Sequence, residues 1–286
     1  MTEKASGDIL TQVAHRYAQN NGVKIHYAVT GQGPLVVFIH GFPDYWYSWR
    51  HQMMGLKDTY RVAALDTRGY NLSDKPEHQQ DYDIDIIVQD VAAVIKAEER
   101  EKAIIVGHDW GGFIAWRFTL SLPQLADKLI IVNLPHPKGL NRELANNAEQ
   151  QANSQYARDF QHPDSHHKLD ARKLAGWIAK DDATLAAYTE AFEKSSFQAM
   201  MNYYRQNYPR PPYKEIDTEM PKVAAPVLQF HGLKDMALHP NGLNDTWQWV
   251  AKDYTLVTLP DADHWAHHDA ADLVTDTMKG WLALRR

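Results

Sequence analysis

Residues 102–112 read KAIIVGHDWGG, and this stretch decides how the rest of the chain is interpreted. The apolar run from Ala103 to Val106 predicts a buried strand that ends at Gly107. Gly111 and Gly112 then open a helix with apolar periodicity. A strand, a sharp turn and a helix with small flanking residues form a nucleophile elbow, in which the strained turn exposes one side chain. That position is usually Ser, and here it is Asp109.

An aspartate at the elbow restricts the chemistry. A carboxylate that attacks an acyl group makes an anhydride, whereas one that attacks a saturated carbon makes an ester that water can cleave. Asp109 therefore indicates an electrophilic sp3 carbon, as in an epoxide or an alkyl halide. The N–H groups and the positive dipole end of the following helix favour the ionised carboxylate. The simpler alternative is an Asp that only caps the helix.

Composition sets the outer bounds. The chain has 286 residues, enough for one large core or one domain with an insertion. A net charge of −6 and a pI near 6.2 give no indication of nucleic acid or an anionic membrane as a partner. Cysteine is absent, which excludes disulfide and thiolate chemistry. The N-terminal stretch MTEKASGDILTQVAHRY has no apolar signal-like region, and no apolar run is long enough to span a bilayer, so we expect a cytoplasmic protein. We expect a monomer or a homodimer.

Short apolar segments alternate with helical patterns along most of the chain. The strand patterns are a hairpin at 13–18 and 23–29, followed by 35–39, 62–65, 103–106, 128–132, 227–230 and 254–259. The helical patterns are 45–56, 84–98, the helix after Asp109 and 273–284. This alternation predicts a mostly parallel sheet covered on both faces. We expect a core domain of residues 1–136 and 216–286, interrupted by a helical lid at 137–215 over the strand ends.

Other candidate site residues follow predicted strands. The loop His40-Gly41-Phe42-Pro43 stands where such a fold donates one oxyanion-hole N–H, and the residue after the nucleophile donates the other, so the backbone N–H groups of Phe42 and Trp110 are candidates. A simple strand-to-loop turn is the alternative.

The candidate base and acid come late in the chain. His264, in LPDADHW, fits the nucleophile, acid, base order, and Asp235, in QFHGLKDMAL, is the candidate acid that orients it. A turn Asp is the alternative for Asp235. Five further histidines are expected to be solvated surface residues, without a metal-binding pattern: His162, His166, His167, His267 and His268.

Tyrosines in the predicted lid are candidate proton donors. A phenol can hold and protonate an alkoxide as an epoxide opens. Tyr156 and Tyr204, the latter in the run Tyr203-Tyr204-Arg205, are the candidates. Aromatic packing within a helical lid is the alternative for any one of them.

These stretches together resemble the soluble, bacterial-type epoxide hydrolases of the α/β-hydrolase fold, along nearly the whole chain. The resemblance rests on HGFPDYWYSWRHQ from His40, ALDTRGYNLSDKP from Ala64, GHDWGG from Gly107, NYYRQN from Asn202 and DADHW from Asp261. It implies Asp109 as nucleophile, His264 as the base with Asp235 as the acid that orients it, and Tyr204 and Tyr156 as the lid tyrosines that bind the epoxide oxygen. The resemblance also implies a cis bond before Pro43, a small apolar epoxide and water as substrates, and no cofactor or metal.

Two alternatives stay open. Haloalkane dehalogenases share the fold and the Asp nucleophile and hold the halide with Trp; Trp110 would be one donor and lid Trp177 the second. A catalytically silent ligand-binding protein on the same scaffold is the other alternative, although an intact triad argues against it. Diol formation from an epoxide separates these hypotheses.

Overall fold

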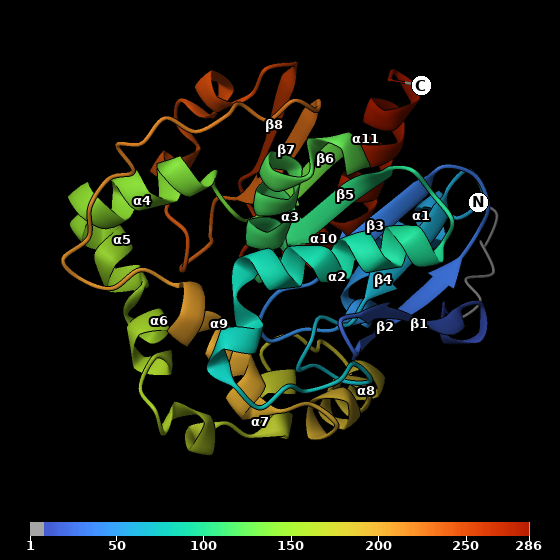
Figure 1. Ribbon diagram of the computed structural model, residues 1–286, viewed down its shortest axis with the longest axis horizontal. Helices are drawn as coiled ribbons and strands as arrows, with labels where there is room; N and C mark the ends of the chain where they lie inside the picture. The colour runs from blue at the N-terminus through green and yellow to red at the C-terminus, as the bar shows by residue number, and fades with distance from the viewer. Residues whose placement is uncertain (1–8, 286) are drawn as a thin grey trace.

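The computed structural model describes residues 9–285 (Figure 1). Residues 1–8, which belong to the N-terminal stretch without an expected signal sequence, lie outside this range. An eight-stranded sheet forms the centre, with its strands in the order β1-β2-β4-β3-β5-β6-β7-β8. Its strands are β1 (Ala14–Asn20), β2 (Val23–Thr30), β3 (Leu35–Ile39), β4 (Arg61–Leu65), β5 (Ala103–His108), β6 (Ala126–Val132), β7 (Val227–Gly232) and β8 (Tyr254–Leu259).

The sheet is parallel except at one edge, where β2 pairs antiparallel with both β1 and β4. Every residue of β3, β5 and β7 is buried, as expected for strands that helices cover on both faces. From β3 the chain crosses to β4 on one side and then to β5 on the other. The C-terminal ends of β3 and β5 thus form a topological switch point, where open α/β sheets place their sites.

Helices cover both faces of the sheet. Figure 1 shows α2 and α3, which contact each other, in front of the strands, and α11 behind them. α11 packs there against α1. The bounds of the helices of this layer are α1 (Arg50–Leu56), α2 (Ile84–Ala97), α3 (Trp110–Ser121), α10 (Ala266–Asp269) and α11 (Ala271–Ala283).

The connection between β6 and β7 is helical and contains no strand. It carries α4 (Pro137–Asn146), α5 (Ala148–Asn153), α6 (Gln155–Phe160), α7 (Ala171–Ala175), α8 (Asp182–Glu193) and α9 (Phe197–Asn207). These helices lie along the left and lower sides of Figure 1, beside the sheet rather than on its two faces. We propose that they form the lid at 137–215. Within residues 9–285, no helix has the length and apolarity needed to cross a membrane.

Local details differ from the sequence expectation in one place. The pattern at 45–56 predicts one helix, but the structure has a 3-10 turn at Trp46–Trp49 followed by α1. Tyr45 is extended, and the Trp46 N–H donates to the buried carboxylate of Asp66 at 3.0 Å. The Ser48 N–H donates to the Tyr45 carbonyl three residues earlier, and Trp49, at φ −90° and ψ 9°, separates this 3-10 turn from α1.

Candidate active site

Asp109 stands on the strained turn that the elbow requires. Its φ is +51° and its ψ is −121°, a conformation that non-glycine residues rarely adopt. A Cβ at Gly111 would collide with the carbonyl oxygen of Ile39, so only glycine lets α3 begin this close to β3. The Asp109 side chain makes no capping hydrogen bond to α3. The simpler interpretation of Asp109 as a helix cap is therefore wrong.

The neighbouring strand end supplies a donor to this carboxylate. β3 and β5 pair in parallel with Ile39 opposite Gly107, which brings residues 41 and 42 beside Asp109. The Phe42 N–H donates to Asp109 Oδ1 at 2.7 Å, and a Cβ at Gly41 would collide with the same carboxylate. The Phe42–Pro43 bond is cis, as the resemblance implies. Trp110 begins α3, and its backbone N–H as the second donor stays a prediction.

His40 holds the donating peptide in place. Its Nε2 accepts the Thr67 N–H at 3.0 Å, so its Nδ1 carries the proton and donates to the Gly41 carbonyl at 2.8 Å. That carbonyl and the Phe42 N–H belong to one peptide unit. Burial lowers the pKa of His40, which keeps the ring neutral in this tautomer.

The other two predicted residues meet Asp109 from separate loops. His264 follows β8 and Asp235 follows β7. His264 Nδ1 lies 2.9 Å from Asp235 Oδ2, and its Nε2 lies 3.6 Å from Asp109 Oδ2. The structure therefore brings together all three predicted residues in a line from Asp235 through His264 to Asp109.

Electrostatics in this line follow from burial and mutual charge. Burial alone would lower the pKa of His264, but Asp235 and Asp109 outweigh it and raise that pKa well above its usual value. Burial alone would raise the pKa of both carboxyl groups, but His264 and their hydrogen-bond donors bring each pKa below the usual value. Asp109 is therefore ionised at neutral pH, as a nucleophile must be.

Two supporting residues were not anticipated from the sequence. Asn133, at the end of β6 with φ of +45°, donates to Asp235 Oδ2 at 2.8 Å and to the Asp263 carbonyl at 3.0 Å. His108 Nε2 donates to the His264 carbonyl at 2.8 Å, and burial lowers the pKa of His108 to about 3. Their positions at strand ends beside the motif residues were the only signal in the sequence.

Tyr204 in α9 and Tyr156 in α6 lie beside Asp109. Their ring centroids are 6.1 Å apart, and both rings line the two cavities that meet at Asp109. Burial raises the pKa of each phenol well above its ordinary value, so both hydroxyls stay protonated and able to donate. The Trp110 ring packs edge-on against the Tyr204 ring, with centroids 5.0 Å apart.

The cavities are mainly apolar and differ in size. One has a volume of about 220 Å³ and extends between α3 and the lid, past Trp110, Leu140 and Tyr208. The other has a volume of about 600 Å³ and contains Phe42, Trp177 and His264. His264 lines only the larger cavity.

The five histidines that were expected at the surface divide into two groups. His162 and His167 are exposed and His166 is partly exposed, but His267 is fully buried, so the expectation of a solvated surface is wrong for His267. Asp44, His267 and His268 form the one group in the described chain whose donor atoms lie close enough to share a metal. The Ser48 hydroxyl lies between them, 2.6 Å from Asp44 Oδ2, 2.8 Å from His267 Nε2 and 3.1 Å from His268 Nε2. This hydroxyl donates to Asp44 and can accept from both rings, whereas the buried Nδ1 of His267 has no hydrogen-bond partner in the described structure.

Comparison with known proteins agrees with this geometry. Residues 34–271 match the family model of the alpha/beta hydrolase fold. Epoxide hydrolase 1 of Caenorhabditis elegans is 34% identical over 287 residues, covering 93% of this chain and 70% of the relative. The AB hydrolase superfamily protein YfhM of Bacillus subtilis is 32% identical, covering 93% of this chain and 97% of that protein.

A solved structure gives the same result in three dimensions. The Bacillus megaterium epoxide hydrolase in complex with an inhibitor superposes with a TM-score of 0.86 at 32% identity, covering 94% of this chain and all of that one. Sequence and structure together assign this chain to the α/β-hydrolase fold family and, within it, to the epoxide hydrolases.

Proposed function

We propose that the protein hydrolyses a small apolar epoxide to a vicinal diol in two steps, through a covalent ester on Asp109. One observation carries the proposal: an ionised, buried Asp109 has the His264–Asp235 pair on one side and two protonated tyrosines above it. An epoxide needs a nucleophile and an acid on opposite sides of the carbon–oxygen bond that breaks.

In the first step, Asp109 attacks the epoxide carbon. Oδ1 accepts the Phe42 N–H, so Oδ2 is the nucleophilic oxygen and Oδ1 becomes the ester carbonyl. The Oδ2–carbon bond forms as the carbon–oxygen bond of the ring breaks, and the electron pair moves to the ring oxygen. That oxygen takes a proton from Tyr204 or Tyr156. No base is needed, because the carboxylate is already ionised.

In the second step, water from the larger cavity attacks Cγ of Asp109 and gives a proton to His264 Nε2. Negative charge gathers on Oδ1, beside the Phe42 N–H and the positive end of α3. The Cγ–Oδ2 bond then breaks, and the diol leaves with Oδ2 and the proton from His264. The other water proton returns to the tyrosinate, so the cycle consumes only epoxide and water.

The tyrosine pair favours an epoxide over a haloalkane. A departing halide is a weak base that needs only N–H donors, whereas an alkoxide needs acidic O–H donors. The Trp110 ring packs edge-on against Tyr204, and Trp177 is 55% exposed, so neither indole is committed to a halide site beside Asp109.

A substrate panel tests this proposal. The wild-type protein is mixed with styrene-type, aliphatic and glycidyl-ether epoxides and with 1-chloro- and 1-bromoalkanes, and diol and free halide are measured. We expect diol from at least one epoxide class and slower or no halide release. Halide release faster than the turnover of every epoxide would favour the dehalogenase alternative, and no turnover of either class would favour the silent binding protein.

A further inference from the structure

Gln150 lies between the loop that carries Asp235 and the helix that carries Tyr156. It belongs to α5 in the lid, and its side chain is fully buried. A buried primary amide needs partners for both N–H groups and for its oxygen. The partners of Gln150 are divided between two segments that the proposed reaction uses.

The first segment is the turn that follows Asp235. Gln150 Nε2 donates to the Ala237 carbonyl at 2.8 Å, and Oε1 accepts the His239 N–H at 2.8 Å. Asp235 Oδ1 accepts the N–H groups of Ala237 and Leu238 at 2.8 and 3.1 Å. The Gln150 amide thus holds the backbone of residues 237–239, and two N–H groups of the same turn hold the Asp235 carboxylate.

The second segment is the start of α6. Gln150 Nε2 also lies 2.9 Å from Ser154 Oγ, which in turn accepts the Tyr208 hydroxyl at 2.9 Å. Ser154 is 1% exposed and immediately precedes α6, in which Tyr156 is the second residue. The Gln150 side chain therefore connects the turn after Asp235 with the start of the helix that carries Tyr156.

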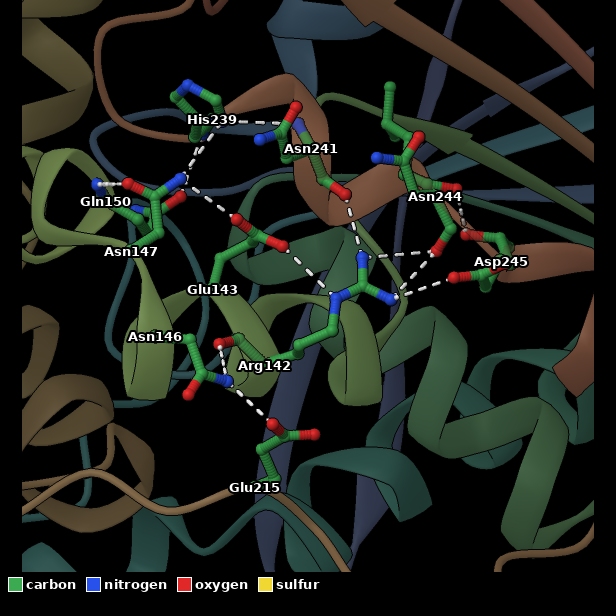
Figure 2. Close-up of polar contacts among 12 residues, drawn as sticks. Arg142, Glu143, Asn146, Asn147, Gln150, Glu215, His239, Asn241, Asn244 and Asp245 are labelled. Atoms are coloured by element: carbon green, nitrogen blue, oxygen red, sulfur yellow. Dashed lines mark hydrogen bonds and ion pairs between the residues drawn. The ribbon is translucent and has the colours of Figure 1, made fainter.

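Polar contacts around Gln150 hold it in this position. Figure 2 shows Asn147, whose Oδ1 caps the start of α5 at the Glu149 and Gln150 N–H groups and whose Nδ2 donates to Glu143 at 2.9 Å. Arg142 of α4 contacts the same core loop further along, at the carbonyls of Asn241 and Asn244. Arg142 also donates to Glu143 at 3.1 Å but is hydrogen-bonded to no residue of the Asp235 turn in the described structure, so Arg142→Met controls for a general loosening of α4 and α5 against this loop.

We infer that Gln150 is a positioning residue for both steps, holding the Asp235 turn for ester hydrolysis and the start of α6 for alkylation. The inference rests on the proposed function. When the amide is lost, Asp235 moves away from His264, and its charge stabilises the imidazolium less. The pKa of His264 in the alkyl-enzyme then falls and hydrolysis slows, because the base is less well oriented.

The test compares three variants by single-turnover kinetics across pH: Gln150→Met, which keeps the volume, Ser154→Ala and Arg142→Met. Alkylation is followed by Trp fluorescence and ester hydrolysis by the decay of the adduct. For Gln150→Met we expect both steps to slow, hydrolysis by about tenfold, since misplacement by 1 Å can cost about 10²-fold. The acid limb of hydrolysis should move to lower pH. Ser154→Ala should slow alkylation and leave that limb in place, and Arg142→Met should change thermal stability only.

The acid limb of the pH profile of hydrolysis distinguishes a loss of positioning by Gln150 from a general loss of folding. A smaller folded fraction lowers the amplitude but cannot move the limb. The other titratable side chains around His264 are Asp109, Asp263, His108, His231 and His267, and Gln150 is hydrogen-bonded to none of them in the described structure.

Two results would overturn the inference. One is a Gln150→Met variant in which the maximal rate of hydrolysis and the acid limb of its pH profile equal those of the wild-type protein. The other is an Arg142→Met variant that shows the changes expected for Gln150→Met. If Gln150→Met does not fold, Ser154→Ala decides, because unchanged alkylation in that variant contradicts the link to Tyr156. Failure of the proposed function looks different, since the wild-type protein would then form no adduct on the Asp109 peptide.

Discussion

Among the single residues, Asp109 is the most informative, because its two carboxylate oxygens have different partners. The Phe42 N–H holds Oδ1, and His264 faces Oδ2. The strained backbone of Asp109 makes this arrangement specific, because a relaxed turn would move the carboxylate off the switch point between β3 and β5. The role of each site residue can therefore be tested in one of the two steps, alkylation or ester hydrolysis.

Replacement of Asp109 by Ala should abolish turnover while the fold remains. No other carboxylate in the line can attack the substrate, because Asp235 is held by His264 and Asn133. Loss of a covalent nucleophile is expected to reduce the rate by several orders of magnitude. Diol formation and thermal unfolding are measured together. A variant that keeps more than a tenth of the wild-type activity contradicts the assignment of Asp109.

Replacement of His264 by Gln should block only the second step. The ionised Asp109 still alkylates, but the ester lacks a base for water, so a substrate-sized adduct should accumulate on the Asp109 peptide in mass spectrometry. Hydrolysis in the wild-type protein should likewise slow as the pH falls through the pKa of His264 in the alkyl-enzyme, where the ester no longer carries the Asp109 charge that helps to raise that pKa. An unmodified His264→Gln protein after long incubation with a proven substrate contradicts this order of steps.

The lid tyrosines should act in alkylation. Tyr204→Phe and Tyr156→Phe each remove one proton donor while keeping the ring, and each should slow adduct formation about 10²-fold, as for a positioned general acid. The double variant should be nearly inactive, since no phenol is then left to stabilise the alkoxide. Single-turnover quenching of Trp fluorescence measures the rate. Wild-type alkylation in the double variant would show that the rings only pack the lid.

At the scale of elements, the parallel register of β3 and β5 sets the site. Continuous apolar runs and the glycine pattern of GHDWGG predicted both strands and the elbow between them. The break at Trp49 within 45–56 was missed, because a short 3-10 turn before an α-helix has no sequence periodicity of its own. Short lid helices had only a general helical character in the sequence.

The close approach of α3 to β3 gives a test at this scale. Gly111→Ala places a methyl group against the Ile39 carbonyl, a contact with rigid backbone, and should destabilise the protein by about 1–3 kcal/mol, as overpacking does. Gly280→Ala is the matched control, because its Cβ meets nothing within 4 Å in α11. That change should stabilise the protein by about 0.5–1 kcal/mol. Urea unfolding compares the two, and equal midpoints would contradict the packing argument.

In the whole molecule, the site is assembled from six segments that are distant in sequence. Asp109, Asp235 and His264 were predictable because each follows a strand and all C-terminal strand ends meet at one edge of the sheet. Asn133, His108 and Gln150 were not, because a polar side chain that braces another residue has no sequence pattern of its own. His267 was misjudged for the same reason, since its burial depends on contacts with Trp49 and Ser48.

The fate of one water oxygen distinguishes a covalent ester on Asp109 from direct attack of water on the epoxide. The wild-type protein, in excess over a proven epoxide substrate, is allowed one turnover in water labelled with oxygen-18. If water attacks Cγ of Asp109, the label enters the peptide that contains Asp109, and the diol carries only unlabelled oxygen. Label in the first-turnover diol, with an unlabelled Asp109 peptide, would mean that water attacks the epoxide itself and would contradict the account.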